Sequence, residues 1–426
     1  MHLMRNSSGP TRRTVLASSA ALAVPAFATA APRMTITVAA FPLVDEIAKA
    51  ALPIWQQLHP DVEVRIVSRQ YADHHTAMTT ALSTSVLLPD AMALESSFVG
   101  RFAQGGGLED LRPAPYSIAK AREKLVPFAY DQAIARNGAV VAMPGDIGPG
   151  AMLCRSDVLE RAGVSESDLT QSWDSYIAAG ARIKARTGAH LIGHVRSMKD
   201  LLQRTGMKPG EGTYFDADSR VLVTTDRFVR TFELCLEARR LKLDAKVPAW
   251  SNEWAEGLKR GTLATELSGA WLVGQLSNWI APQTAGLWRA AQLPEGVATS
   301  YGGAYYAMPR RAPPERKAMA WEFIRLMSLN RERQLFAFKN YDAFPALLET
   351  NNDPFFDEPV PFLGGQKARR LWRDAALKIK ATYLHKQNFF ADEVVSTELD
   401  NVLDRGKSIR TALGDAQRLL ERRAFR

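Results

Sequence analysis

The spacing of apolar positions alternates between two periods along the first part of the chain. Residues 34–40 are rich in β-forming side chains with a period-2 component, whereas residues 44–58 place apolar side chains on one stripe of a helix. Further strands are expected at 62–67 and 91–94, and further helices at 71–85 and 97–104. This β-α-β-α-β order predicts an α/β fold, with a parallel sheet and helices on both of its faces.

A second α/β unit follows a loop that interrupts the pattern. Residues 139–143 predict a strand, and this strand leads into Pro144-Gly-Asp-Ile-Gly-Pro-Gly150. Because glycine frees the backbone and proline fixes φ, we expect the first crossing between two domains here. Beyond the loop, helices are expected at 155–162, 173–186, 226–242, 252–257, 314–328 and over most of 392–420, with a strand at 302–308.

The composition is that of a globular protein and limits the possible partners. The chain has 426 residues, of which 46% are hydrophobic and 23% charged, so it is long enough for two or three domains. The formal net charge is +9, and Arg5, Arg12 and Arg13 contribute to it within the first 31 positions. The other basic residues do not gather with aromatic side chains, so we expect no nucleic-acid partner.

The first 30 residues have the features of an export signal. A basic start with paired arginines precedes an apolar stretch at 15–24, which is too short to span a bilayer. Ala28-Thr29-Ala30 then provides a signal-peptidase pattern. The paired arginines resemble a twin-arginine signal, although Val15 and Ala17 depart from it, so general secretion stays open. No later stretch reaches 18 apolar residues. We expect cleavage near Ala30 and a periplasmic mature protein.

Motifs typical of catalysis or of a cofactor site are missing from the sequence. It contains no GxSxG, HExxH, Walker A, GxGxxG or CxxC pattern. His190 and His194 have metal-ligand spacing, but they lie in an apolar run without an acidic or cysteine partner, so we interpret them as structural or surface residues. We expect no metal and no cofactor. Cys154 and Cys235 can form a disulfide or remain two buried thiols, and both alternatives stay open.

Aromatic side chains are concentrated between residues 250 and 306. They are Trp250, Trp254, Trp271, Trp279, Trp288, Tyr301, Tyr305 and Tyr306. Several stand beside glycines, which allow a ligand to approach the backbone, while an indole offers a flat face to the C–H surface of a sugar. We expect Trp271 to face a cleft and the other tryptophans to lie in the core.

Two acidic residues stand where strands are expected to end. Glu95 follows the strand at 91–94, and Asp146 lies in the crossing loop. Ligands of open α/β sheets bind beyond the carboxyl ends of the strands, so both acids are expected to point towards one crevice. A helix cap or a hinge salt bridge is the structural alternative for each of them.

Four stretches, in order behind an export signal, resemble the family 1 extracellular solute-binding proteins, the sugar-receptor subunits of bacterial ABC importers. They are Pro89-Asp-Ala-Met-Ala-Leu-Glu-Ser-Ser-Phe-Val99; Pro144-Gly-Asp-Ile-Gly-Pro-Gly-Ala-Met152; Ser268-Gly-Ala-Trp-Leu272 with 281–288; and Gly302-Gly-Ala-Tyr-Tyr-Ala-Met-Pro309 with 320–324. The resemblance covers residues 32–426. It implies a two-lobe, type II-like periplasmic-binding-protein fold with three crossovers, in which each lobe has a mostly parallel sheet flanked by helices.

The resemblance also implies lobe boundaries and ligand contacts. The N-terminal lobe would comprise residues 31–145 and 292–338, and the C-terminal lobe residues 146–291 and 339–426. Carried over by position, the ligand contacts are Phe41, Pro42, Glu95, Ser96, Asp146, Trp271, Gly302, Gly303, Tyr305 and Tyr341. Many relatives have Asp where Glu95 stands, and the additional methylene moves the carboxylate outwards.

The function implied by the resemblance is that of a monomeric receptor. It would capture a sugar or oligosaccharide in the cleft and deliver it, chemically unchanged, to the membrane permease subunits of an ABC transporter. Two alternatives stay open. One is a receptor for an organic anion or a polyamine, and the charge of +6 that remains without the first 31 residues slightly favours an anion. The other is a secreted glycoside-acting enzyme with Glu95 and Asp146 as its acid/base pair.

Overall fold

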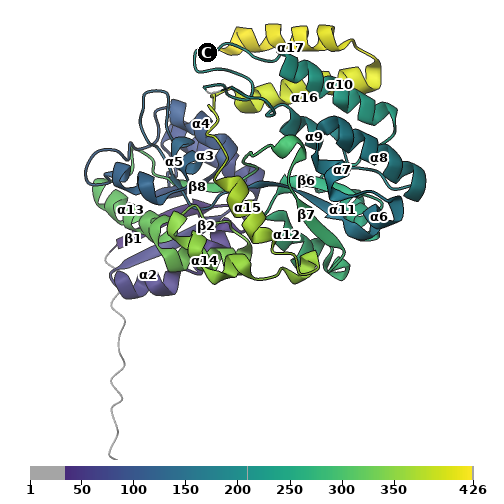
Figure 1. The fold of residues 1–426 in the computed structure, drawn as a ribbon. Helices are drawn as coiled ribbons and strands as arrows, with labels where there is room; N and C mark the ends of the chain where they lie inside the picture. The colour runs from purple at the N-terminus through teal and green to yellow at the C-terminus, as the bar shows by residue number, and fades with distance from the viewer. Residues whose placement is uncertain (1–33, 209, 425–426) are drawn as a thin grey trace, which may run out of the picture.

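The protein consists of two lobes, each built on its own sheet (Figure 1). A computed structural model describes residues 34–208 and 210–424. The sheet of the first lobe has the order β2-β1-β3-β8-β4. Its strands are β1 (Met34–Ala40), β2 (Val62–Ser68), β3 (Ala91–Glu95), β4 (Met143–Pro144) and β8 (Ala304–Ala307). The chain therefore leaves the first lobe after β4 and returns to it before β8.

The second lobe contains a smaller sheet with the order β6-β5-β7. Its strands are β5 (Gly150–Arg155), β6 (Thr265–Gly269) and β7 (Trp288–Ala291). Parallel pairing continues beside β6 through two single bridges, His190 with Leu263 and Ile192 with Asp244. The three short strands are thus the centre of a wider α/β layer.

In each sheet one strand runs against its neighbours. β1 pairs in parallel with β2 and β3, whereas β8 is antiparallel to both β3 and β4. β5 is likewise antiparallel to both β6 and β7. β8 and β5 are the strands through which the chain enters a lobe after a crossing, so they start where the other strands end. The other strands therefore end at the crossings. The expected two-lobe α/β fold with mostly parallel strands is confirmed.

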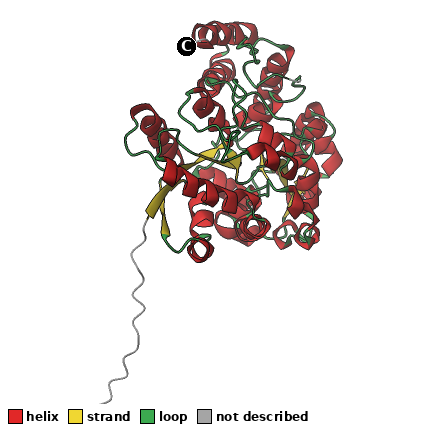
Figure 2. Cartoon of the chain, turned by 90° about the vertical axis from the view of Figure 1, so that its left-hand side faces the viewer, coloured by secondary structure: helices red, strands yellow, loops and turns green. Residues whose placement is uncertain are grey.

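Helices cover the strands on both sides (Figure 2). They are α1 (Val44–Lys49), α2 (Leu52–Leu58), α3 (Tyr71–Thr84), α4 (Ser96–Gln104), α5 (Pro127–Asp131), α6 (Ser156–Ala162), α7 (Glu166–Thr170), α8 (Trp173–Thr187), α9 (Val195–Leu202), α10 (Asp226–Arg240), α11 (Asn252–Arg260), α12 (Leu272–Gln275), α13 (Pro314–Leu329), α14 (Arg331–Tyr341), α15 (Ala368–Ala376), α16 (Asn388–Arg405) and α17 (Ile409–Ala424). Within the described ranges, none of these helices has both the length and the apolar character needed to cross a bilayer.

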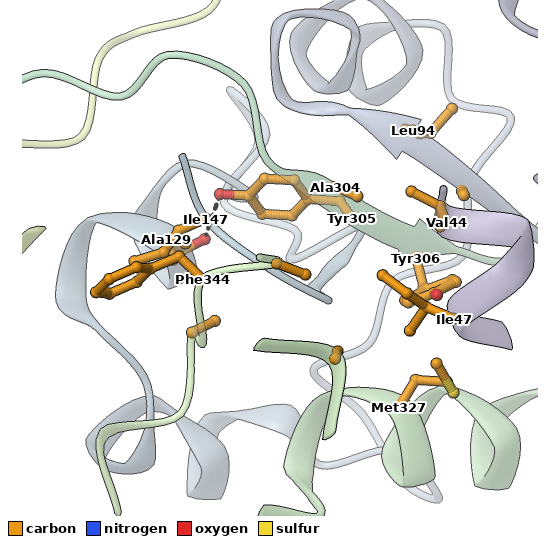
Figure 3. Close-up of a cluster of buried hydrophobic side chains, with 14 of the residues drawn as sticks. Val44, Ile47, Leu94, Ala129, Ile147, Ala304, Tyr305, Tyr306, Met327 and Phe344 are labelled. Carbon is orange, nitrogen blue, oxygen red and sulfur yellow. Dashed lines mark hydrogen bonds between the residues drawn. The ribbon is translucent and has the colours of Figure 1, made fainter. Parts of the chain in front are cut away.

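β8 illustrates how the first lobe is filled. Its side chains alternate between the two faces of the sheet, as they do in any strand. Tyr305 points towards α5, while Tyr306 points towards Ile47 of α1 and Met327 of α13 (Figure 3). Both tyrosines are almost fully buried. They tie helices on opposite faces to the strand by which the chain re-enters this lobe.

The apolar core is continuous on the side of the crossings. One cluster fills the first lobe and extends through the crossings to Trp254 and Trp288 of the second lobe. A second cluster lies entirely in the outer part of the second lobe, among α6, α8, α9, α10, α16 and α17. The lobes are therefore joined through a packed hinge and not through a loose linker.

Two predicted elements of the first lobe differ in the structure. The helix expected at 44–58 is broken, because α1 ends at Lys49 and α2 begins at Leu52. Pro53 has no N–H to donate into the preceding turn, which explains the break. The strand expected at 139–143 is shorter, because Ala135 and Ala139 form a local turn and only Met143 and Pro144 join the sheet.

The two cysteines are separate buried thiols. Cys154 lies on β5 with its Sγ 3.5 Å from the carbonyl oxygen of Arg289, and Cys235 lies on α10 with its Sγ 3.5 Å from that of Val195. Burial raises the pKa of both thiols, to about 12 for Cys154, so both are poor nucleophiles. The sequence left open whether the two cysteines form a disulfide, and in the structure they do not.

One buried amide connects the crossings at the hinge. Gln334 of α14 is 2% exposed. Its Nε2 donates to the carbonyl oxygens of Gly145, at 2.5 Å, and Met327, at 2.8 Å, and its Oε1 accepts from the N–H of Ala346 at 3.0 Å. The side chain thus joins the first crossing to the segment that follows α14.

Replacing Gln334 by alanine is expected to lower the free energy of unfolding by about 3 kcal/mol, because buried backbone groups lose their partners. Urea unfolding would measure the loss. The matched control is Asn340→Ala, which removes an exposed amide from the same helix and is expected to cost less than about 0.5 kcal/mol. Equal losses in the two variants would contradict this role for Gln334.

Candidate functional site

The carboxyl ends of β1, β2 and β3 form one wall of the candidate site. Phe41 follows β1 and is 9% exposed, and the neighbouring Pro42 is exposed. The ring of Phe41 meets the ring of Tyr71 edge-on at 5.6 Å and lies 5.3 Å from that of His75. Tyr71 begins α3, just after β2. The structure therefore groups Phe41 and Pro42 with a tyrosine that sequence reasoning did not select.

Glu95 ends β3 and caps α4. Its carboxylate accepts from the N–H of Ser97 at 3.0 Å, the hydroxyl of Ser96 at 2.7 Å and the hydroxyl of Tyr71 at 3.2 Å. Burial and the Glu95 charge both raise the pKa of Tyr71, so this phenol stays a hydrogen-bond donor. The structural alternative, a helix cap, is therefore present. Glu95 is nevertheless half-exposed beside Tyr71, where a ligand hydroxyl could reach it.

Ser96 ties this wall to the second crossing. Its N–H donates to the carbonyl oxygen of Gly303 at 2.9 Å, and its hydroxyl lies 3.1 Å from that of Gly302. Gly302 and Gly303 have φ values of 86° and 104°. Other residues rarely adopt this region, so the glycines allow the carbonyl groups to turn towards Ser96.

Asp146 lies at the same junction, on the first crossing. Its carboxylate accepts from the N–H of Ala304, and its own N–H donates to the Ala304 carbonyl oxygen at 3.2 Å. Burial, with a smaller contribution from the Glu95 charge, raises the pKa of Asp146 to about 7 against the opposing effect of the bond from Ala304. Asp146 and Glu95 thus both lie beside Ala304, which pairs with Glu95 across the sheet.

Tryptophans form the wall on the second lobe. Trp271 precedes α12 and donates its indole N–H to the carbonyl oxygen of Tyr301 at 2.8 Å. Its ring lies nearly parallel to that of Trp250, at 11° and 5.9 Å. Trp254 lies 5.2 Å from Trp250 and donates to the carboxylate of Glu266 at 2.9 Å. A row of indoles therefore runs from the core to the surface.

The expectation that all tryptophans except Trp271 lie in the core is wrong for two of them. Trp254 and Trp288 are buried, as expected, but Trp250 is 54% and Trp279 63% exposed. Trp250 stands before α11 with φ 71°, which directs its ring onto Trp271. The indole N–H of Trp279 bonds the side chain of Gln275, in the same helical segment.

Two predicted ligand contacts are not part of this group. Tyr305 is 1% exposed, and its hydroxyl donates to the carbonyl oxygen of Ala129 at 3.0 Å (Figure 3). Its place on β8 turns it into the core, so the expectation of a ligand contact is wrong for its side chain. Tyr341 ends α14 beside Phe336, and among the described residues no hydrogen bond or ring contact joins it to Glu95 or Trp271.

Sequence reasoning missed Tyr71 and placed Trp250 in the core. Tyr71 follows the carboxyl end of β2, so the rule that selected Glu95 after β3 could have selected it. Nothing in the local sequence indicated that Trp250 is exposed, because its position depends on contacts with α11 and with Trp271. Tyr301 was noticed as an aromatic residue, but the structure uses its backbone.

The arrangement suits a ligand with both hydroxyl groups and C–H faces. One wall offers carboxylate, phenol and hydroxyl groups, and the other offers indole faces. In the described part of the chain, no group of three or more His, Cys, Asp and Glu residues could hold a metal ion. The two walls offer hydrogen-bonding groups and stacking surfaces to a ligand.

Comparisons with known proteins agree with this architecture. The model of a family described as bacterial extracellular solute-binding protein matches residues 37–334. A lactose-binding protein of Rhizobium radiobacter is 27% identical over 232 residues, 52% of each chain. An arabinooligosaccharide-binding protein of Bacillus subtilis strain 168 is 26% identical over 183 residues, 42% of this chain and 41% of the relative. The chain thus spans about half the length of these relatives or less.

The fold is also similar to that of solved structures. An ABC transporter associated binding protein of B. animalis subsp. lactis Bl-04, in complex with beta-1,6-galactobiose, superposes with a TM-score of 0.75. The sequence identity is 22%, and the match covers 92% of this chain and 97% of that one. At a sequence identity of 22%, this similarity establishes the fold alone.

A buried acid beside the tryptophans makes stability depend on pH. Glu266 is 3% exposed, and burial raises its pKa from 4.5 to about 7, although the bond from Trp254 opposes the rise. The folded protein therefore keeps this proton up to about pH 7, whereas the unfolded chain loses it near pH 4.5. Stability is thus expected to fall as pH rises from about 4.5 to about 7.

The variant Glu266→Gln removes this titration. The difference in the free energy of unfolding between the variant and the wild type is expected to change by about 3 kcal/mol in favour of the variant when the pH rises from 4 to 8. Urea unfolding at several pH values would measure this, with the exposed Glu253→Gln as control. Parallel pH profiles for wild type and Glu266→Gln would contradict the assignment.

Proposed function

Because the chain belongs to the bacterial extracellular solute-binding protein family, we propose that it captures a sugar or oligosaccharide between its two lobes and delivers it to the permease subunits of an ABC transporter. One observation carries the proposal. Residues 301–303 bind both walls of the site through consecutive carbonyl groups, Tyr301 to Trp271 and Gly302 and Gly303 to Ser96. An indole platform and a polar wall therefore meet at a hinge.

Carbohydrate is the ligand class that the site chemistry and the relatives both favour. The two curated relatives are named for lactose and arabinooligosaccharide, and the structural neighbour was solved with a galactobiose. In this chain Trp271 and Trp250 would stack on a sugar ring, while Glu95 and Tyr71 would form hydrogen bonds with the hydroxyl groups of the sugar. We propose Phe41, Pro42, Ser96, Asp146, Gly302 and Gly303 as the positions that shape the same wall.

Capture requires no chemistry on the ligand. The ligand would dock on one lobe, and bending at the crossings would bring the other lobe onto it. The ligand promotes closure only to the extent that its contacts are more favourable in the closed form. Micromolar affinity corresponds to about −8 kcal/mol, which a few hydrogen bonds to charged groups at about 1.5–3 kcal/mol each and one stacked ring can supply.

The two rival functions fit the geometry less well. For a glycoside-acting enzyme, Glu95 and Asp146 would have to be free to exchange protons with substrate, but Ala304 binds Asp146, and Ser96, Ser97 and Tyr71 bind Glu95. For an anion receptor, the half-exposed carboxylate of Glu95 at this wall would repel the ligand, although Arg69 follows β2 at the same edge of the sheet. We therefore propose that the ligand is neutral and that the protein releases it chemically unchanged.

A thermal-shift screen against a sugar library tests the proposal directly. A ligand at 100 times its dissociation constant is expected to add about 2.7 kcal/mol of stability. Including organic acids and polyamines in the screen separates the receptor alternatives, and assaying oligosaccharides for new reducing ends tests for hydrolysis. A shift by a non-sugar alone, or released reducing ends, would overturn the sugar-receptor function.

Trp271→Ala is expected to weaken binding of any sugar found in that screen at least tenfold, because it removes the indole that is tied to the hinge. Isothermal titration calorimetry would measure the affinity. Trp279→Ala is the matched control, since it removes an exposed indole of the same lobe outside the proposed contacts. Equal affinity in the two variants would remove Trp271 from the site.

We further propose that the protein is a periplasmic monomer that has lost residues 1–30. These residues lie outside the described part of the chain, so the support is the sequence pattern and the family. N-terminal sequencing of the exported protein is expected to begin near Ala31. A sequence beginning at Met1 would contradict the cleavage.

A further inference from the structure

One short segment, apart from the crossings, contacts both lobes. Residues 382–385, which we name the strap, connect α15 to α16. The backbone N–H and carbonyl oxygen of Thr382 bond the side chain of Gln132, at 3.1 and 2.8 Å, in the first lobe. Tyr383 pairs with Gly212, and the ring of His385 stacks on Phe215 at 4.1 Å, both in the second lobe.

Leu384 returns to the first lobe. Its carbonyl oxygen accepts from Nε2 of Gln104 at 3.1 Å, and it lies against Gly100 so closely that a Cβ on that glycine would overlap Leu384. Successive residues of an extended segment point to opposite sides, and the hydroxyl of Tyr383 also lies 3.5 Å from Nε2 of Gln104, so the strap contacts both lobes along its length. The strap is thus a contact between the lobes in addition to the crossings.

The strap is attached to the two lobes in different ways. On the second lobe, His385 is 2% exposed, and α16 packs along α17 and α10. On the first lobe, the contacts are the side chains of Gln132 and Gln104, the face of Gly100, and the side chain of Leu384, which packs against the apolar cluster of that lobe. A crevice of about 520 Å³, lined by Arg101, Gln104, Gln387 and Phe389 among others, lies between α4 and the start of α16. The strap is therefore continuous with α16 of the second lobe, whereas it meets the first lobe through side-chain contacts beside a crevice.

The contacts between the strap and the first lobe are connected to the wall of the candidate site. Phe389, which follows the strap, lies 5.9 Å from Phe98 of α4. Phe98 stacks on His75 at 3.9 Å, and His75 accepts from the N–H of Glu95 at 3.1 Å. Contacts thus run without interruption from the strap to the residue that caps α4.

We propose that the strap is a releasable latch: it belongs to the second lobe and holds the first lobe closed through Gln132, Gln104 and Gly100. Bending at the hinge parts these contacts while the contacts with Gly212 and Phe215 persist. The latch sets how far the ligand-free protein opens. It therefore adds a protein-encoded contribution to closure that exists before any ligand binds.

The test uses ligand-free protein and the variant Gly100→Ala, whose methyl group displaces Leu384. Hydrogen exchange in peptides covering 379–386 is expected to speed up at least tenfold, and small-angle scattering is expected to give a larger radius of gyration. Gly105→Ala is the matched control on the same helix, because its Cβ would meet only the carbonyl oxygen of Phe102, at 3.6 Å, and that of Arg101.

Gln132→Ala is the second variant, should Gly100→Ala fail to fold. It removes both bonds to Thr382 without adding volume and is expected to change exchange and radius in the same direction. Unchanged exchange at 379–386, or faster exchange spread evenly through the core of the first lobe, would overturn the latch. Because no ligand is present, the outcome is independent of whether the protein captures a sugar.

Discussion

Three consecutive carbonyl groups hold the two halves of this molecule in register. Tyr301 accepts from the indole of Trp271 in the second lobe, Gly303 accepts from the N–H of Ser96 in the first, and the carbonyl oxygen of Gly302 lies 3.1 Å from the Ser96 hydroxyl. A side chain at position 302 or 303 would oppose the positive φ that turns these carbonyl groups. The aromatic and the polar wall depend on this short segment for their relative position.

The interface between the lobes is strongly asymmetric. On the side of the crossings, one apolar cluster passes from lobe to lobe, and Gln334 satisfies backbone groups of separate segments. At the strap, the first lobe is held by the side chains of Gln132 and Gln104 and by the approach of Leu384 to Gly100, and a crevice borders these contacts. Bending is therefore expected to part the strap contacts before it exposes the apolar cluster of the crossings.

Three acids are buried in or near the crossings. Burial raises the pKa of Asp146 and Glu266 to about 7 and that of Asp342, which lies against Gly274, to about 6. Neutral carboxyl groups cost much less to bury than ionised ones. The cost of burying these three groups in the folded protein is therefore small at mildly acidic pH and grows as pH rises towards 8.

Local sequence was sufficient to predict the order of strands and helices and the positions of Phe41 and Glu95, because strand ends and caps depend on neighbours in the chain. It also indicated the crossing at 144–150, because glycine and proline act on their own backbone. The break at Pro53 could have been foreseen on the same ground.

Other features became known from the folded chain alone: Tyr305 faces the core, Trp250 lies on Trp271, the cysteines stay apart and the strap contacts both lobes. Each of these depends on segments distant in sequence, whose meeting is set by packing and not by local pattern.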